Sequence, residues 1–276
     1  MINGTPFVMP LKRKKTSRKG ENGRVLVVGG SEVFHGAPIL AGLGAEKSGA
    51  DLIYLMVPKN QVNLTRQYSL NLIVQSFSGQ FLRPRDVQKI VDWSEKADVL
   101  VIGNGLGERP QTLRACKHIL TKTKCDLVVD ASALAAFAEI KKDFGKRQLV
   151  LTPHRGELAK MTGCNICKQP GPEIKDFVAE WAKKWKSTLV LKGAEDIISD
   201  ASGNLHINKS GHPIMTKGGT GDVLAGLIGG LLSQGLTSFE AAKEGTELWG
   251  KIGEAVYKKK GNLVGVEDLV GKTEQC

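Results

Sequence analysis

Six short apolar runs, separated by stretches with helical periodicity, most strongly constrain what this chain of 276 residues can fold into. The runs are almost continuously apolar, which is typical of strands buried on both faces of a parallel sheet. Parallel neighbours need crossovers, so the stretches between them are predicted to be covering helices. The predicted strands span 24–28, 51–57, 98–102, 126–130, 148–152 and 188–192. The predicted helices lie near 36–48, 84–95, 110–122, 132–139, 155–162 and 173–186.

The region after residue 192 departs from this alternation. Two strand-like runs within 196–208 flank Ser202 and Gly203 and predict a hairpin with a tight turn. Helices are predicted over 221–234 and 238–258, and the second carries an apolar stripe that faces a core. The stripe consists of Phe239, Ala242, Thr246, Trp249, Ile252 and Val256. The sequence therefore predicts a single α/β domain over 1–276, with helices on both faces of a mostly parallel sheet.

A formal net charge of +11 favours anionic partners such as phosphates, nucleotides or nucleic acid. Part of the excess lies within a basic N-terminal arm over 1–22, where Lys and Arg dominate residues 12–19. No aromatic side chain is interleaved with these charges to stack on bases. A solvated terminal arm is therefore favoured over RNA binding, and nucleic acid is not the expected partner.

The lengths of the apolar runs and the number of cysteines indicate the cellular compartment of the protein. No apolar stretch is long enough to cross a membrane, and no charged-then-apolar leader is present, so a cytoplasmic protein is expected. Five cysteines, an odd number without a disulfide framework, fit that expectation. Cys164 and Cys167 form a C-x-x-C pair, but no second pair completes a zinc site, so ordinary cysteines are favoured over a metal or redox pair.

Unusual residues follow five of the predicted strands. The sequences "GGSEVFHGAP" (29–38), "GNGLG" (103–107) and "PHRGE" (153–157) each follow a strand, Asp130 ends another, and Lys192-Gly193 ends a fifth. Glycine-rich turns often end strands for steric reasons alone. Ligands of open α/β sheets, however, bind beyond the carboxyl ends of the strands, so five such turns on one edge predict a binding site.

The stretch "KGGTGDVLAG" (217–226) places one carboxylate behind several glycines at the predicted start of a helix. Gly218 and Gly219 permit unusual backbone angles, and Thr220 can cap the helix. The free amides at 219–222 would then face outward as an anion site. Asp222 either complements the helix dipole or acts as a general base beside a phosphate, and the stretch alone does not decide between the two.

These motifs together resemble those of the ADP/ATP-dependent NAD(P)H-hydrate dehydratases of the ribokinase-like superfamily. The resemblance covers nearly the whole chain, in order, and therefore implies a ribokinase-like three-layer α/β/α fold. Its motifs are "KGENGRVLVVGGS" (19–31), "GAPILAGLGAEKSGA" (36–50), "VIGNGLG" (101–107), "VVDASAL" (128–134), "LTPHRGELAKMTG" (151–163), "LVLKG" (189–193) and "KGGTGDVLAG" (217–226).

The resemblance implies an activity. The family removes the water that has added to the nicotinamide ring of NADH or NADPH, in the S epimer, by spending a nucleotide phosphoryl group. It implies a lyase that uses ADP or ATP as co-substrate with Mg²⁺ bridging the phosphates. It also implies a homo-oligomer, a tetramer among the possibilities, and a separate epimerase for the other epimer.

The resemblance also assigns roles to residues. Asp222 would be the catalytic base at the hydrated nicotinamide. The hydrated cofactor would also be bound by Ala37, a glycine of the turn (Gly105 or Gly107) and His154. The nucleotide would be bound by Lys192, Gly193, Ala194, Glu195, Asp196, Gly218, Gly219, Thr220 and Gly221. Without the resemblance, His154 is better explained as a helix cap and Glu157 as a helix-start carboxylate.

Several positions depart from the family pattern. Asn104 and Arg155 replace prolines, and Ala194, Glu195 and Asp196 follow Lys192-Gly193 where threonine is commoner, which leaves the details of nucleotide contact open. Two alternatives also stay open: a kinase of the same fold acting on a vitamin-precursor alcohol, and a nucleotide-binding or RNA-associated regulator suggested by the charge. A kinase would release a phosphorylated alcohol, and a regulator would show strongly salt-dependent RNA affinity.

Overall fold

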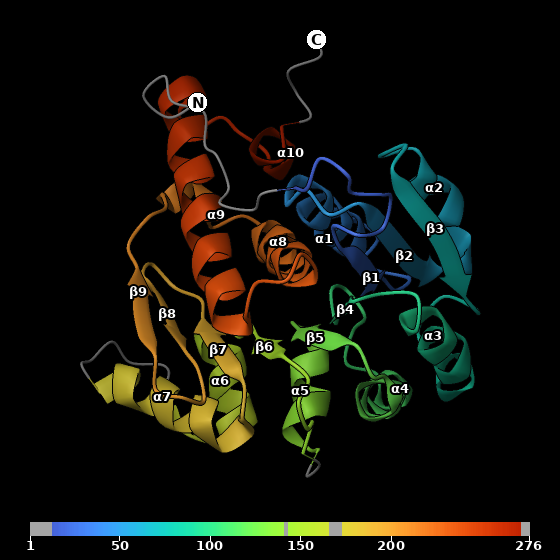
Figure 1. The fold of residues 1–276 in the computed structure, drawn as a ribbon, viewed down its shortest axis with the longest axis horizontal. Coiled ribbons are helices and arrows are strands. Elements are labelled where there is room, and N and C mark those ends of the chain that lie inside the picture. Colours follow the sequence, from blue (N-terminus) through green and yellow to red (C-terminus); the bar gives the residue numbers. More distant parts are fainter. Residues whose placement is uncertain (1–12, 141–142, 166–172, 272–276) are drawn as a thin grey trace.

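The computed structural model describes residues 13–140, 143–165 and 173–271, whose strands form one nine-stranded sheet. The strand order is β3-β2-β1-β4-β5-β6-β7-β8-β9, parallel from β3 to β7 and antiparallel from β7 to β9 (Figure 1). The strands are β1 (Arg24–Val28), β2 (Leu52–Pro58), β3 (Leu72–Phe77), β4 (Val99–Ile102), β5 (Asp126–Val129), β6 (Leu149–Leu151), β7 (Thr188–Leu191), β8 (Asp196–Ser199) and β9 (Leu205–Asn208).

Helices cover both faces of the sheet and make the predicted three-layer α/β/α arrangement (Figure 1). One face carries α1 (Gly36–Lys47), α2 (Val62–Arg66), α8 (Thr220–Ser233) and α9 (Ser238–Lys260), with the short α10 (Val266–Leu269) beside α9. The other carries α3 (Val87–Ser94), α4 (Pro110–Lys122), α5 (Ser132–Ala138), α6 (Arg155–Thr162) and α7 (Glu173–Trp185). Side chains alternate between the faces, so strands β1 to β8 each contribute to two cores, one under each helical layer.

The structure adds elements that the apolar runs did not predict, among them one strand and one helix between β2 and α3. The edge strand β3 (Leu72–Phe77) pairs in parallel with β2, and the short helix α2 (Val62–Arg66) precedes it. In β3, buried and partly exposed residues are interspersed, as expected at a sheet edge, so it lacks a continuous apolar run. The predicted hairpin and its tight turn are confirmed, because the Gly203 amide donates to the Asp200 carbonyl at 3.2 Å and closes a β-turn between β8 and β9. Asp200 Oδ1 also accepts the amides of Ser202 and Asn204 and organises residues 200–204.

Glycines let α1 and α8 cross at very short range. A Cβ at Gly226 would lie 1.8 Å from the carbonyl oxygen of Ala41, and one at Gly44 would lie 2.1 Å from that of Val223. Any larger residue at either position would force the backbones apart. These glycines therefore let α1 and α8 pack closely, and the start of α8 lies at the carboxyl end of the sheet, where Asp222 reaches Asn104.

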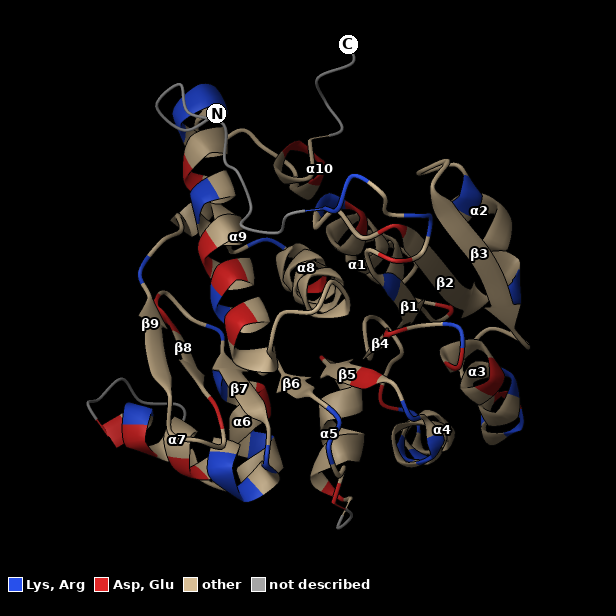
Figure 2. Ribbon diagram, in the orientation of Figure 1, with Lys and Arg blue, Asp and Glu red and all other residues tan. Residues whose placement is uncertain are grey.

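The basic residues are spread over the molecule and are not gathered on one face. Figure 2 shows Lys and Arg along α4 and α7, in the last turn of α9 and in the segment before β1. Residues 1–12 of the predicted basic arm lie outside the described residues. In the described part, Arg13 pairs with Asp51 at 3.1 Å, which anchors this segment beside β2.

Candidate active site

The carboxyl ends of β1, β4, β5, β6 and β7 lie side by side, because these strands are consecutive neighbours in the sheet. The prediction that five unusual turns share one edge is therefore confirmed. Hydrogen bonds tie the turns together: the Gly30 amide donates to the Asn104 carbonyl at 2.8 Å, and the Lys192 amide donates to the Pro153 carbonyl at 2.9 Å. The first turn of α8 is linked to this edge through the side chain of Asp222.

The start of α8 is left open by glycine. Gly219 is the cap residue, in the left-handed conformation with φ of 98°, and it has no side chain that could accept a hydrogen bond from the first turn. The prediction that Thr220 caps the helix is wrong, because the preceding turn brings two carbonyls to its hydroxyl, which donates to Met215 at 2.8 Å and Lys217 at 2.9 Å. The amides of Gly221 and Asp222 lack acceptors within the helix and sit at its positive end, as the predicted anion site requires.

Asp222 belongs to a polar network that joins α8 to the ends of β4, β5, β6 and β7. Asn104 Nδ2 donates to Asp222 Oδ1 at 2.8 Å and to Asp130 Oδ2 at 3.0 Å. Lys192 Nζ pairs with Asp130 Oδ1 at 2.7 Å, and the hydroxyl of Thr152 donates to the same oxygen at 2.8 Å. Two carboxylates and one ammonium are thus held together at the end of the sheet.

The network gives Asp222 unusual acid–base properties. Burial raises its pKa to about 7, with a further rise from the negative charge of Asp130, while the hydrogen bond from Asn104 and the charge of Lys192 act in the opposite direction. Burial lowers the pKa of Lys192, but the charges of Asp130 and Glu157 outweigh it and raise that pKa above its ordinary value. Lys192 therefore stays charged, and Asp222 can exchange a proton near neutral pH.

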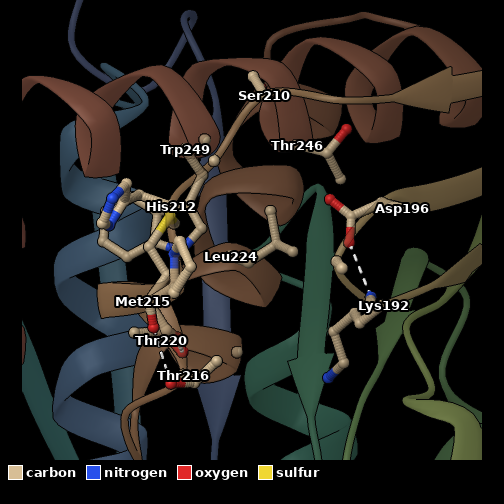
Figure 3. Close-up of a pocket in the computed structure, with 16 residues that line it drawn as sticks. Lys192, Asp196, Ser210, His212, Met215, Thr216, Thr220, Leu224, Thr246 and Trp249 are labelled. Carbon is tan, nitrogen blue, oxygen red and sulfur yellow. Dashed lines mark hydrogen bonds between the residues drawn. The ribbon is translucent and has the colours of Figure 1, made fainter.

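A cavity of about 350 Å³ lies beside the network, between the end of β7, the start of α8 and the middle of α9 (Figure 3). Six residues predicted to bind nucleotide line it, namely Lys192, Gly193, Ala194, Asp196, Thr220 and Gly221. Asp196 Oδ1 accepts the amide of Gly193 at 3.1 Å and fixes the turn after β7. Glu195, Gly218 and Gly219 lie outside this lining, and Glu195 instead faces Lys209 at 3.8 Å.

Part of the cavity wall was not predicted as a site. Leu224, Trp249 and Met215 supply an apolar surface, and Thr246 adds a hydroxyl-bearing side chain (Figure 3). The predicted stripe on α9 does face a core, in which Thr246 and Trp249 are buried, but its middle also reaches the cavity. The one signal in the sequence was Thr246, the single polar residue within the apolar stripe.

The residues predicted to bind the hydrated cofactor lie outside the lining of this cavity. A Cβ at Gly105 would lie 2.9 Å from the Cβ of Ala37, so the turn after β4 contacts the start of α1. Gly107 has a positive φ of 77° and faces open space. His154 caps α6, since its Nδ1 accepts the Glu157 amide at 3.2 Å and Glu157 Oε2 accepts the His154 amide at 2.8 Å. Capping leaves the imidazole 60% exposed and open to a ligand.

Two other sequence features concern metals and membranes. Across residues 13–140, 143–165 and 173–271, no group of three or more His, Cys, Asp or Glu side chains is placed to hold a metal ion. Cys164 is a free thiol, and its C-x-x-C partner Cys167 lies outside the described residues. In the same ranges we find no helix with the length and apolar character needed to cross a membrane.

The family model for NAD(P)H-hydrate dehydratase matches residues 25–274. The chain belongs to the NAD(P)H-hydrate dehydratase family. The resemblance inferred from the motifs is thereby confirmed, and the three-layer fold is that of the family's solved structures.

Three relatives illustrate the NAD(P)H-hydrate dehydratase match. The ADP-dependent (S)-NAD(P)H-hydrate dehydratase of Nitrosopumilus maritimus is 42% identical over 261 residues, covering 94% of this chain and 89% of that protein. A bifunctional NAD(P)H-hydrate repair enzyme of Moorella thermoacetica is 35% identical, and the match covers 91% of this chain but 48% of that protein. The ADP/ATP-dependent enzyme of Bacillus subtilis, co-crystallised with ATP and Mg²⁺, superposes with a TM-score of 0.80 at 28% identity, covering 94% and 90% of the two chains.

Proposed function

We propose that this protein is a nucleotide-dependent dehydratase that restores NADH or NADPH from the S epimer of the hydrated cofactor. The observation that carries the proposal is the placement of Asp222, whose pKa is raised to about 7, beside open helix amides and a cavity of nucleotide size. Family membership supports the same activity, since relatives of nearly equal length are named for it.

In this mechanism Asp222 accepts the proton of the hydroxyl on the hydrated ring, and that oxygen attacks the terminal phosphoryl group of the nucleotide. The amides of Gly221 and Asp222 stabilise the phosphoryl oxygens as the bond to the leaving nucleotide breaks. Phosphate then departs with its electron pair from the ring carbon, the neighbouring carbon loses a proton, and the ring double bond returns. The ammonium of Lys192, near Gly221, adds positive charge to this region.

The nucleotide would occupy the cavity lined by Lys192, Gly193, Asp196 and Thr220, with its base against the apolar wall formed by Trp249 and neighbours. Mg²⁺ would enter with the phosphates, because the described residues provide no cluster of protein ligands for it. Ala37, Gly105, Gly107 and His154, which lie outside the cavity lining, would bind the hydrated cofactor.

A direct assay tests the proposal. Purified protein is mixed with S-hydrated NADH or NADPH, MgCl₂ and either ADP or ATP, and the absorbance of reduced nicotinamide is followed with the release of inorganic phosphate. Recovery of absorbance in step with phosphate is expected with at least one nucleotide. A phosphorylated alcohol as the only product would instead establish a kinase, and no turnover of either hydrate by folded protein would contradict the proposal.

Two further proposals concern partners. A separate epimerase is expected to supply the S epimer, so the assay on mixed epimers should stop once that epimer is consumed and resume when an epimerase is added.

The family resemblance also supports a homo-oligomer, with a tetramer expected, which light scattering on the purified protein would test.

A further inference from the structure

Asn104 occupies a position that the backbone fixes tightly. It lies in the turn after β4, and its carbonyl accepts the amide of Gly30 at 2.8 Å. The preceding Gly103 has a φ of 126°, and a Cβ there would lie 1.8 Å from the carbonyl oxygen of Asp130. The residue is fully buried. Its side chain therefore has little freedom in where it points, and it points at the two carboxylates of the site.

The side-chain amide uses both of its hydrogens on carboxylates. Nδ2 donates to Asp130 at 3.0 Å and to Asp222 at 2.8 Å, residues that lie 26 and 118 positions away in the chain. The orientation of the amide follows from chemistry, because a flipped amide would turn its oxygen toward two negative charges.

The other end of the amide argues against a purely structural role. Oδ1 of Asn104 is buried and has no hydrogen-bond partner in the described part of the chain. Leaving a buried acceptor unpaired lowers stability, so a residue serving only to brace the turn would be better apolar. The hydrogen bonds that the Asn104 side chain makes with described residues all come from the two N–H groups of its amide.

The surroundings of Asp222 show why these donors matter. Its carboxylate lies close to Asp130 and within the field of Glu157, which both disfavour its charge, while Lys192 favours the charge but bonds to Asp130. Asn104 counters this repulsion directly, because its Nδ2 donates a hydrogen bond to Asp222 Oδ1 at 2.8 Å. Without it, Asp222 would be free to rotate and would hold its charge less readily.

We propose that Asn104 is a positioning residue for the reaction, whose amide orients the ionised Asp222 carboxylate toward the substrate hydroxyl while holding it apart from Asp130. This role rests on the proposed function of Asp222 as the base. It concerns a position at which this chain departs from the proline of its family's usual pattern, and it explains how the departure fits the site.

The test removes the side-chain amide of Asn104 without creating a cavity. Asn104→Leu fills a similar volume but donates no hydrogen bond, so the pKa of Asp222 should rise by about one to two pH units from its value of about 7. The carboxyl titration is followed by NMR in protein labelled with ¹³C-aspartate, with Asp222→Asn used to assign the signal. An unchanged Asp222 titration in folded Asn104→Leu protein would overturn the proposal.

Kinetics give a second readout that a structural defect would not reproduce. At pH 7 kcat/KM should fall about tenfold, and it should largely recover at pH 9, because the shifted base is deprotonated there. A loss of equal size at every pH would overturn the role. Thr112→Val is the matched control: it removes a buried hydrogen bond to the carbonyl of Leu82, away from the site, and should leave the pH profile unchanged.

Two arrangements keep the test decisive. Where Asn104→Leu does not fold, Asn104→Ala is measured against the same criteria. The wild-type protein gives an independent check. The chemical shifts of the Asn104 side-chain amide should change with pH at the same midpoint as the Asp222 carboxyl. Shifts that do not change at this midpoint would contradict the proposed contact. The NMR titrations do not require turnover. Inactive wild-type protein would therefore contradict the proposed function, but the effect of Asn104 on the Asp222 titration could still be measured.

Discussion

Helices α8 and α9 pack against each other and begin in opposite ways. Helix α9 is closed by its own side chains: Thr237 Oγ1 accepts the Glu240 amide at 3.3 Å, and Glu240 Oε2 accepts the Thr237 amide at 3.0 Å. Helix α8 has Gly219 in place of the threonine and Asp222 in place of the glutamate, three residues after the cap in both helices. The same helical position thus carries an acid in both, yet only in α9 does the acid turn back onto the cap.

The two acids respond oppositely to their surroundings. Hydrogen bonds from the backbone and hydroxyl of Thr237 lower the pKa of Glu240, which lies at the surface. Burial and the charge of Asp130 raise the pKa of Asp222. A helix start that satisfies its own amides is stable but closed to ligands, whereas one left open by glycine keeps its amides and its acid available for chemistry.

The largest expected effect is on kcat, and it should follow substitution of Asp222 but not of Glu240. Asp222→Asn keeps the size of the side chain but removes the base, and should lower kcat by about 10²- to 10⁴-fold. Glu240→Gln is the matched change in α9 and should leave kcat unchanged. Both are measured by the nucleotide-dependent recovery of NADH absorbance, and equal rates for wild type and Asp222→Asn would remove Asp222 from the mechanism.

The second effect concerns stability and pH. Because folding raises the pKa of Asp222 from 3.8 to about 7, the folded protein binds an extra proton between these values, so stability is lost as the pH rises from about 4 to 7 and the loss is complete above pH 7. Asp222→Asn removes this cost and should raise the free energy of unfolding at pH 8 by up to about 4 kcal/mol. The gain should fall as pH drops through 7 and vanish near pH 4, as urea unfolding at several pH values would show. A gain independent of pH would mean that Asp222 does not titrate as described.

The glycine that opens α8 can be tested against its neighbour. Gly219→Ala would force a side chain into the left-handed conformation, with its Cβ 2.4 Å from Leu40 Cδ1, and should cost about 1–3 kcal/mol of stability. Gly218→Ala is the control, because no atom lies within 4 Å of its Cβ position and its φ is not positive. Thermal unfolding of both variants provides the comparison, and equal losses would show that the strain at Gly219 is unimportant.

The smallest effect is expected at the closed helix. Thr237→Ala removes the cap of α9 and should lower the free energy of unfolding by about 1 kcal/mol without changing kcat. Chemical denaturation and the absorbance assay measure the two quantities. A loss of activity comparable to that of Asp222→Asn would mean that the start of α9 takes part in the site.

The sequence predicted the elements whose signals are local. The buried parallel strands show as continuous apolar runs, and the glycines before Asp222 mark the open helix start. The antiparallel pair β8 and β9 was predicted from the turn around Gly203. The edge strand β3 was missed, because its interspersed polar residues, such as Gln75, resemble a loop in single-sequence patterns.

Features that depend on distant contacts could not be predicted. Asn104 stood out only as a departure from a pattern, since its partners Asp130 and Asp222 become neighbours only when the sheet forms. Trp249 was correctly placed in the core, but periodicity gives no sign that a core residue also borders a cavity. The hydroxyl of Thr220 was misassigned because helix-cap preferences do not take the preceding turn into account.

The close crossing of α1 and α8 has a mechanical consequence for how this enzyme could close over its ligands. Gly44 and Gly226 place each helix against the other's backbone, so neither can slide or rotate without a collision. Ala37 and Asp222, at the starts of these helices, therefore move as parts of one rigid body. Any hinge that admits the cofactor and the nucleotide must lie outside this pair of helices.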